Sequence, residues 1–216
     1  IRRKMAQIQR GLEKVRRSRA IMRRNRQKRG LPIVCLVGYT NAGKSTLFNV
    51  LTRSHATVED RLFATLDPMV RRMHLGNGQI ALLSDTVGFI RKLPHSLIHA
   101  FRATLEELLS ADLLLHVVDA SQPRREEQIG AVEEVLGEIG AAQKPILLVY
   151  NKVDRLNGKE ALLGNGHSER IAVSALTGEG IACLRSRLYS RLFPSMAAAP
   201  GGKIALTMRE HCANKA

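Results

Sequence analysis

A glycine-bounded loop that ends in a lysine and a serine is the first stretch of this chain able to carry chemistry. Residues 38–45 read Gly-Tyr-Thr-Asn-Ala-Gly-Lys-Ser and fit the phosphate-binding pattern G-x-x-x-x-G-K-S. In such a loop the backbone N–H groups point inward at phosphate oxygens, and the positive end of the following helix adds to the attraction. We therefore predict that Lys44 reaches the outer phosphates of a nucleotide and that the Ser45 hydroxyl is a ligand of Mg²⁺.

A second candidate stretch, Asp-Thr-Val-Gly at residues 85–88, follows an apolar strand pattern. Asp85 is suited to hold Mg²⁺ through a water molecule, and the backbone N–H of Gly88 is suited to meet a terminal phosphate. An aspartate at the end of a strand is also a common helix cap or turn residue. On its own, this stretch does not decide between a Mg²⁺ and phosphate site and an ordinary cap or turn.

Two later stretches carry groups that can recognise a base. In Asn-Lys-Val-Asp at residues 151–154, the Asp154 carboxylate can accept hydrogen bonds from N1 and N2 of guanine, a pair of donors that adenine does not offer. The aliphatic stem of Lys152 can lie along the face of the base. In Ser-Ala-Leu at residues 174–176, the Ala175 N–H can donate to guanine O6. Because these stretches follow separate predicted strands in this order, we predict that the nucleotide is GTP or GDP.

Strands and helices alternate around these stretches. Continuous apolar runs predict strands over 31–37, 113–118, 145–150 and 171–173, and a Gly-Asn-Gly turn at 76–78 predicts a hairpin of 67–75 with 79–84. Apolar residues at helical spacing predict helices over 46–52, 94–108, 124–140 and 181–192. The predicted fold is therefore an α/β domain with a mostly parallel, six-stranded sheet that is flanked by helices.

A basic arm precedes this domain. Residues 1–29 contain 13 Lys or Arg and one acid, so they carry +12 of the net charge of +15. Their apolar residues recur at alternating spacings of four and three, which predicts an amphipathic helix with a narrow apolar face. We weigh three roles: a solvated linker, a contact with nucleic-acid phosphates, or a membrane-surface helix. The lack of large apolar anchors weakens the third role.

Three segments are expected: the basic helix at 1–29, a nucleotide-binding domain at 30–194, and a linker with a tail or the start of a further domain at 195–216. The chain begins with Ile1 rather than Met, so we expect it to be part of a longer protein. It shows neither a signal-peptide pattern nor a long apolar run, which predicts a soluble protein. The cysteines are isolated from one another, so we expect neither a zinc site nor a disulfide framework, and a reducing compartment is favoured.

Taken together, these stretches resemble the HflX family of ribosome-associated GTPases, within the Ras-like P-loop superfamily. The resemblance lies in the phosphate loop and first helix at 38–49, in Leu-Phe-Ala-Thr-Leu-Asp-Pro at 62–68, and in the stretches 85–90, 93–94 and 100–107. It covers roughly residues 1–192, since 1–29 look like the last helix of the family's helical subdomain. The chain departs from the family at Met69-Val70, where two threonines are usual, and it lacks the family's N-terminal domain.

The resemblance implies a Mg²⁺-dependent GTPase in which Thr65 is the switch threonine that binds Mg²⁺ and closes over the γ-phosphate. Lys44, Thr65 and Gly88 are the predicted catalytic residues. Phe89 stands where many small GTPases have a glutamine that orients the attacking water, so we expect slow hydrolysis that a partner accelerates. The residues assigned to the nucleotide are Asn41, Ala42, Gly43, Lys44, Ser45, Thr46, Asp85, Gly88, Asn151, Lys152, Asp154, Ser174, Ala175 and Leu176.

The resemblance also suggests a cation and partners. In some related GTPases an asparagine at the position of Asn41 helps to hold K⁺ near the phosphates. The expected partner is the large ribosomal subunit with its rRNA, in ribosome splitting, rescue or maturation; DNA is not expected, and membrane contact is at most peripheral. We expect a monomer in the cytoplasm, with the mitochondrial matrix as the alternative. The alternative function is a nucleotide-gated binding module in RNA modification or stress signalling, whose slow hydrolysis only resets it.

Overall fold

The computed structural model describes residues 30–54, 69–85, 108–156 and 170–197. Apart from the first two residues, all of these belong to one compact unit, Pro32–Ala216. The predicted basic helix at 1–29, most of the predicted helix at 94–108 and nearly all of the predicted tail lie outside the described residues. Those elements and the three segment boundaries stay predictions.

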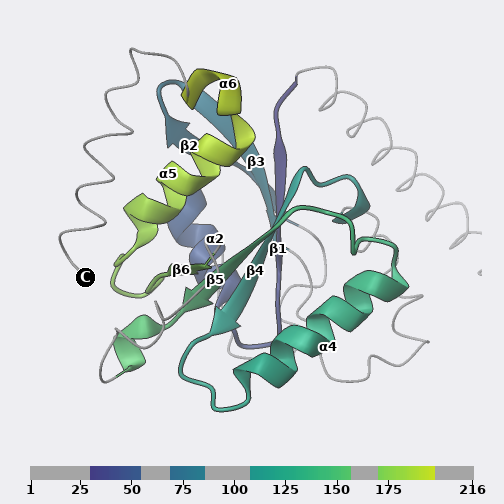
Figure 1. Cartoon of the computed structure of the whole chain (residues 1–216). Coiled ribbons are helices and arrows are strands. Elements are labelled where there is room, and N and C mark those ends of the chain that lie inside the picture. The colour runs from purple at the N-terminus through teal and green to yellow at the C-terminus, as the bar shows by residue number, and fades with distance from the viewer. Residues whose placement is uncertain (1–29, 55–68, 86–107, 157–169, 198–216) are drawn as a thin grey trace, which may run out of the picture. The chain divides into compact units, whose positions relative to one another are not determined.

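A six-stranded sheet in the order β2-β3-β1-β4-β5-β6 forms the centre of this unit (Figure 1). Every neighbouring pair is parallel except β2 and β3, which form an antiparallel hairpin. The predicted mostly parallel, six-stranded sheet and its hairpin are therefore confirmed. The strands are β1 (Ile33–Val37), β2 (Met69–Gly76), β3 (Gln79–Asp85), β4 (Leu113–Asp119), β5 (Ile146–Asn151) and β6 (Arg170–Ala172).

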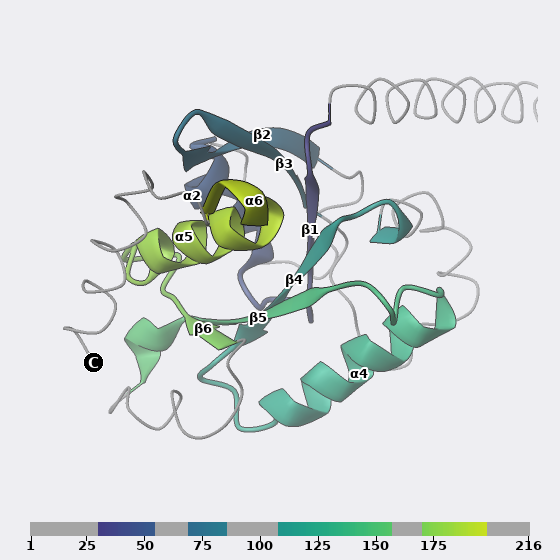
Figure 2. The ribbon, with the colours of Figure 1, turned by 45° about the horizontal axis from the view of Figure 1, so that its top comes forward.

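Helices cover both faces of the sheet. Helices α2 (Lys44–Thr52) and α5 (Ile181–Leu192) lie on one face, and α4 (Arg125–Glu138) lies on the other (Figures 1 and 2). Two short elements were not predicted from the sequence: the 3₁₀ turn η1 (Val153–Arg155) and the helix α6 (Pro194–Ala197). Helix α6 overlaps residues 195–197, at the start of the segment 195–216 that was predicted as a linker and tail.

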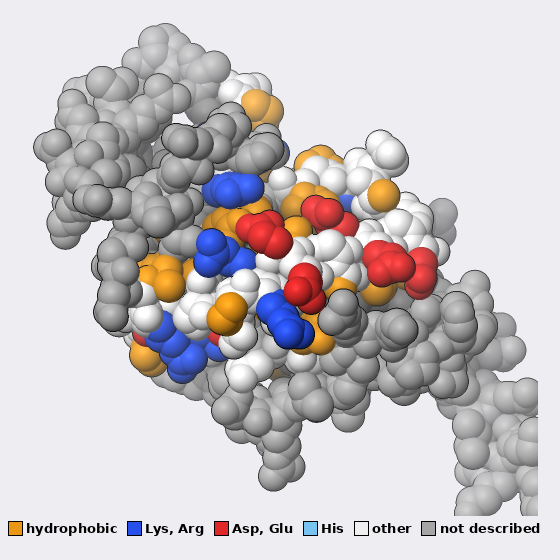
Figure 3. Space-filling model, turned by 60° about the horizontal axis from the view of Figure 1, so that its bottom comes forward, with side chains coloured by type: hydrophobic (Ala, Val, Ile, Leu, Met, Phe, Trp, Pro, Cys, Tyr) orange, Lys and Arg blue, Asp and Glu red, His pale blue; other side chains and the backbone are white. Residues whose placement is uncertain are grey.

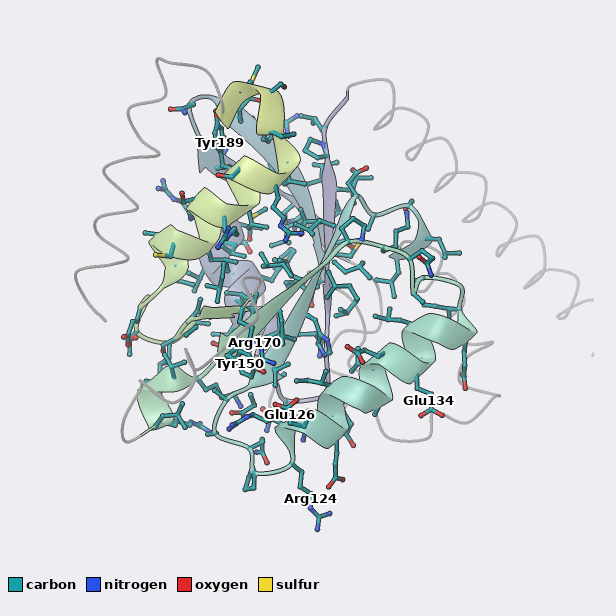
Figure 4. The ribbon with its side chains drawn as sticks, in the orientation of Figure 1. Arg124, Glu126, Glu134, Tyr150, Arg170 and Tyr189 are labelled. Carbon is teal, nitrogen blue, oxygen red and sulfur yellow. The ribbon has the colours of Figure 1, made fainter. Side chains whose placement is uncertain are left out.

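The apolar strands are buried because helices pack against both of their faces. Strand β4 is buried along its whole length. The larger core lies between the sheet and the pair α2 and α5, with Phe48 and Leu184 fully buried in it. A smaller core beneath α4 contains Ile129 and Tyr150, and the guanidinium carbon of Arg170 lies 5.8 Å from the centre of the Tyr150 ring (Figure 4).

Arg185 of α5 ties three elements together. Its Nη2 donates to the carbonyl oxygens of Val50 (3.1 Å) and Leu51 (2.9 Å), and its Nη1 donates to the carbonyl of His74 in β2 (2.6 Å). The last carbonyls of a helix have no partner within the helix, so these bonds satisfy groups at the end of α2 that would otherwise need water. One side chain therefore joins α5, α2 and the hairpin.

The structure tests the expectations drawn from the cysteines and from the apolar runs. Cys35 in β1 is buried, and Cys183 in α5 is disulfide-bonded. The isolated positions of the cysteines led us to expect no disulfide, and that expectation is corrected because residues distant in sequence can meet in a fold. Within the described ranges, no helix combines the length and apolar character needed to cross a bilayer.

Replacement of Arg185 by lysine should destabilise this domain. Lysine keeps the positive charge but cannot reach three carbonyl groups in a fixed planar arrangement. We expect the Arg185→Lys variant to lose about 2 kcal/mol of unfolding free energy in urea titrations, the size expected when charged hydrogen bonds are lost. The exposed Arg53 provides the control, because Arg53→Lys should change stability by less than about 0.5 kcal/mol. Equal losses in the two variants would contradict the role assigned to Arg185.

Candidate nucleotide-binding site

The predicted site residues that the structure describes come from segments at the carboxyl ends of β1, β3, β5 and β6. In parallel sheets these ends meet along one edge, where the following loops form a crevice for ligands. Figure 3 shows this end of the molecule, where acidic and basic side chains are interspersed. The sheet therefore brings stretches together that lie far apart along the chain.

The phosphate loop follows β1 and ends at the start of α2. A Cβ atom at Gly38 would lie 2.2 Å from the carbonyl oxygen of Val117 in β4, and one at Gly43 would lie 2.3 Å from Nδ2 of Asn151. Both glycines also have positive φ angles. Only glycine permits these close approaches, so the loop is pressed against β4 on one side and against the 151–154 stretch on the other. The N-terminus of α2 has no side-chain cap.

Lys44 lies across the loop. Its Nζ donates to the carbonyl oxygens of Gly38 (3.1 Å) and Tyr39 (2.8 Å), and the residue is only 7% exposed. Burial lowers the pKa of Lys44 to about 8, and the charge of Asp85 opposes this shift. Burial, with a smaller contribution from Lys44, also lowers the pKa of His116 in β4 to about 4. The neighbouring histidine is therefore neutral near pH 7, and the lysine ammonium is placed where a phosphate would stabilise its charge.

Ser45 and Asp85 meet as the candidate metal ligands. The Ser45 hydroxyl in the first turn of α2 donates to Oδ2 of Asp85 at the end of β3, at 2.9 Å. A hydroxyl and a carboxylate are the hard oxygen donors that Mg²⁺ prefers, and Mg²⁺ completes its shell with water and substrate phosphates. The donor set therefore fits the predicted ion. Within the described ranges no group of three His, Cys, Asp or Glu side chains could hold a metal.

Asn151 joins the phosphate loop to the 174–176 stretch. Its Nδ2 donates to the carbonyl of Ala42 (3.0 Å), and its Oδ1 accepts the N–H of Ala175 (3.0 Å). The side chain is buried, so each bond replaces one that water would otherwise make. We had assigned the Ala175 N–H to guanine O6, but in this structure it donates to Asn151. The sequence indicated a base-reading role for Asn151 and gave no sign of this bridge.

Asp154, the predicted base reader, is held by Ser174. The Ser174 hydroxyl donates to Oδ1 of Asp154 at 2.5 Å and accepts the N–H of Thr177 at 3.1 Å. Ser174 is fully buried, whereas Asp154 is exposed. Leu176 is 79% exposed, so it offers an apolar surface close to this network in sequence. The carboxylate is therefore oriented before a base arrives, which lowers the entropic cost of recognition.

Lys152 has two anchors, one of which the sequence did not reveal. Its Nζ donates to the carbonyl of Asn41 at 2.7 Å and forms an ion pair with Oδ2 of Asp119 at 2.8 Å. Oδ1 of Asp119 accepts the N–H and the hydroxyl of Ser121. Burial raises the pKa of Asp119, but the hydrogen bonds from Lys152 and Ser121 outweigh it and hold this pKa below its ordinary value. The position of Asp119 after a buried apolar run was the only available signal.

The remaining predicted residues are distributed as follows. Thr46 lies in the first turn of α2, next to Ser45. Asn41 is exposed and has a positive φ of 60°, the same backbone region as Lys152. Thr65, Gly88 and Phe89 lie outside the described residues, so the assignment of the two switches stays a prediction. The structure thus brings together the phosphate, metal and base groups that it describes.

Comparison with known proteins agrees with this arrangement. Residues 33–152 match the family described as "50S ribosome-binding GTPase". The chain is 53% identical over 191 residues to a "GTPase HflX" of Magnetococcus marinus and 48% identical over 195 residues to a "GTPase HflX" of Escherichia coli. These alignments cover 87% and 89% of this chain but only 44% and 46% of the relatives, so the chain spans less than half of their length.

A solved structure shares the fold. A GTP-binding protein from Sulfolobus solfataricus, crystallised in complex with GDP, is 32% identical to this chain and superposes with a TM-score of 0.61. The match covers 82% of this chain and 57% of that protein. The Ras-like P-loop fold that the sequence predicted is therefore confirmed.

Neutralising Asp119 should increase the rate at which a guanine nucleotide dissociates. The Asp119→Asn variant leaves the largely buried Lys152 ammonium with a weaker partner. Because a charged hydrogen bond is worth about 1.5 kcal/mol, GDP should dissociate about tenfold faster in stopped-flow measurements with a fluorescent GDP analogue. Asp112→Asn is the matched control: it makes the same change just before the opposite end of β4, where Asp112 accepts the N–H of Ile33 (2.7 Å). Unchanged dissociation in Asp119→Asn, or equal acceleration in both variants, would refute this role.

Proposed function

Because the chain belongs to the HflX family of 50S ribosome-binding GTPases, we propose that it is a Mg²⁺-dependent switch that binds and hydrolyses GTP on the large ribosomal subunit. The observation that carries this proposal is the bridge at Asn151. Its two hydrogen bonds connect the loop that suits phosphates to the stretch that suits guanine. A generic phosphate loop needs no such connection to a base-reading stretch, so the bridge supports a nucleotide rather than a simple phosphate as the ligand.

Each described residue has a defined task in this proposal. Lys44 neutralises charge on the outer phosphates, and Ser45 and Asp85 hold Mg²⁺, which supplies further charge neutralisation when it is bound. Asp154, oriented by Ser174, accepts the N1 and N2 hydrogens of guanine. The Lys152 stem, fixed by Asp119, covers one face of the base. An adenine presents no pair of donors to Asp154, so discrimination against ATP follows from this carboxylate.

Hydrolysis itself should be slow without a partner. In this proposal Thr65 closes over the γ-phosphate and the Gly88 N–H contacts it, but the phenyl ring of Phe89 cannot orient an attacking water. In other GTPases, positioning of that water raises the rate of hydrolysis by several orders of magnitude. The ribosome is the proposed source of the missing group, or of the rearrangement that supplies it. Nucleotide-dependent binding would then end when the phosphate bond is cleaved.

We further propose a role in splitting or rescuing ribosomes or in maturing the large subunit, in the cytoplasm or the mitochondrial matrix. The protein would act as a monomer that contacts rRNA rather than DNA. The net charge of +15 supports a phosphate-rich partner such as rRNA. The second candidate, a GTP-gated binding module in RNA modification or stress signalling, uses the same site and differs in its partner.

Purified large ribosomal subunits should accelerate GTP hydrolysis by this protein. We expect a slow basal rate, near the 10⁻⁴ to 10⁻² per second of unassisted GTPases, and an increase of at least about a hundredfold with subunits. Phosphate release with and without large subunits, with small subunits as the control, measures this directly. A free chain that already turns over at several per second would contradict the slow-site proposal. A slow rate that neither subunit changes would favour the alternative function.

A monovalent cation is a second prediction for the same site. Asn41 is exposed at the loop, and its backbone is fixed by the bond from Lys152 to its carbonyl, so its carboxamide is available to a ligand. If it helps to hold K⁺ beside the phosphates, stimulated turnover should fall about tenfold when NaCl replaces KCl at equal ionic strength. The Asn41→Ala variant should be slow in both salts. Equal rates of the unmodified protein in KCl and NaCl would rule the K⁺ site out.

A further inference from the structure

We propose that the outer edge of the sheet binds the phosphate backbone of RNA. The surface consists of Arg71, Arg72 and His74 on β2 together with Arg53 at the end of α2, and we call it the β2 edge surface. The inference deepens the proposed function, on which it rests in part, because it assigns an rRNA contact to named residues of the nucleotide-binding domain. Nothing in the phosphate, metal or base sites uses these side chains.

The four side chains are exposed, and the three arginines among them have no acidic partner within the described residues. Strand β2 pairs only with β3 within the described sheet, so it forms an edge of that sheet. Arg71, Arg72, His74 and Arg53 are all exposed, and no ion pair joins any of them to another described residue. Successive residues of a strand point to opposite faces, so Arg71 and Arg72 project on the two sides of the edge. A phosphate backbone that follows this edge can therefore meet an arginine on either side.

Arg185 makes the surface rigid and adds charge to it. Its bonds to the carbonyls of Val50, Leu51 and His74 connect the end of α2 directly to β2. Arg185 binds the carbonyls of Val50 and Leu51, and Arg53 directly follows the same helix end; in line with this, burial lowers the pKa of the Arg185 guanidinium and the charge of Arg53 lowers it further. Like charges held close together cost stability unless an anion neutralises them. A preorganised cluster of this kind is suited to a polyanion.

Among the described residues, acidic side chains are placed elsewhere. In the described parts of α2, β2, β3 and α5, the only acid is Asp85, which is buried at the metal site. Helix α4, on the opposite face of the sheet, is rich in exposed glutamates, and Figure 4 shows Glu134 pointing away from the sheet. These glutamates are Glu126, Glu127, Glu133, Glu134 and Glu138. The described domain thus has a basic edge and an acidic helix on different sides.

The composition of the surface favours RNA over a membrane or an apolar protein partner. The exposed large apolar residues of the described domain are Leu109, Leu176 and Met196, and none belongs to α2, β2 or β3. A membrane-binding surface needs apolar anchors, and a stable protein interface needs an apolar centre. Arginines on an edge strand also discourage pairing with other strands. That explanation accounts for Arg71 and Arg72 but not for Arg53 or for the link through Arg185.

The surface is separate from the nucleotide site, so the two can be tested independently. Helix α2 has nine residues, with Lys44 at its first position and Arg53 just after its last. At 1.5 Å per residue these residues lie about 13 Å apart along the helix axis. On β2, Arg72 lies opposite Leu82, three residues before Asp85, or about 10 Å along the strand, so its substitution should leave basal GTP hydrolysis unchanged.

The test compares Arg72→Glu with Arg124→Glu in the full chain. Arg124 is exposed at the start of α4, which packs against β4, three strands away from β2 in the sheet, and its replacement changes the net charge by the same amount. Binding to purified large subunits in a non-hydrolysable GTP analogue is measured over a series of KCl concentrations. We expect Arg72→Glu to weaken binding on the order of tenfold and to reduce the slope of log affinity against log salt by about one. Arg124→Glu should change neither.

The same variants are tested on a 20-base-pair RNA duplex. If the unmodified chain ignores large subunits but binds the duplex through Arg72, the ribosomal function fails and the RNA surface stands. If Arg72→Glu and Arg124→Glu weaken binding equally, or neither weakens it, the β2 edge surface is refuted. The inference is also refuted if the unmodified chain binds neither target. Urea unfolding and basal GTP hydrolysis of each variant show that it is folded.

Discussion

The buried carboxamide of Asn151 is the contact on which the candidate site depends. Its Nδ2 holds the phosphate loop through Ala42, and its Oδ1 holds the 174–176 stretch through Ala175. These segments lie 109 and 24 residues away in sequence, so no local preference of the chain could bring them together. The glycine at position 43 is part of the same contact, because any side chain there would collide with Asn151. The residues proposed for phosphate recognition and those proposed for base recognition therefore form one structural unit.

The charged groups described at this site have hydrogen-bond or ion-pair partners. Lys44 donates to two loop carbonyls, Ser45 donates to Asp85, and Lys152 is paired with Asp119. Buried charges without partners would destabilise the fold, so this matching allows an active constellation to persist without its ligand. Within the described residues, the arginines of the β2 edge surface have no acidic partners. Partnered charges thus distinguish the nucleotide site, and arginines unpartnered in the described part of the chain distinguish the surface that suits an external polyanion.

Patterns with a direct physical meaning made much of this fold predictable. Continuous apolar runs identified the buried parallel strands, the Gly-Asn-Gly turn identified the hairpin, and Gly38 and Gly43 identified the phosphate loop. Contacts between distant side chains were not predictable. The ion pair of Asp119 with Lys152 depends on the register that aligns Asp119 with Asn151 across β4 and β5, and the three bonds of Arg185 depend on how α5 packs. Helix α6 and the disulfide at Cys183 were missed because neither leaves a periodic pattern.

The central claim is that one preassembled site reads both guanine and phosphate. Calorimetric titration of the nucleotide-free chain with GDP and with ADP, in the presence of Mg²⁺, tests it most directly. The account predicts that GDP binds at least about a hundredfold more tightly than ADP, since Asp154 finds its pair of donors only on guanine. Comparable affinities for the two nucleotides would contradict it, because phosphate binding would then be independent of the base.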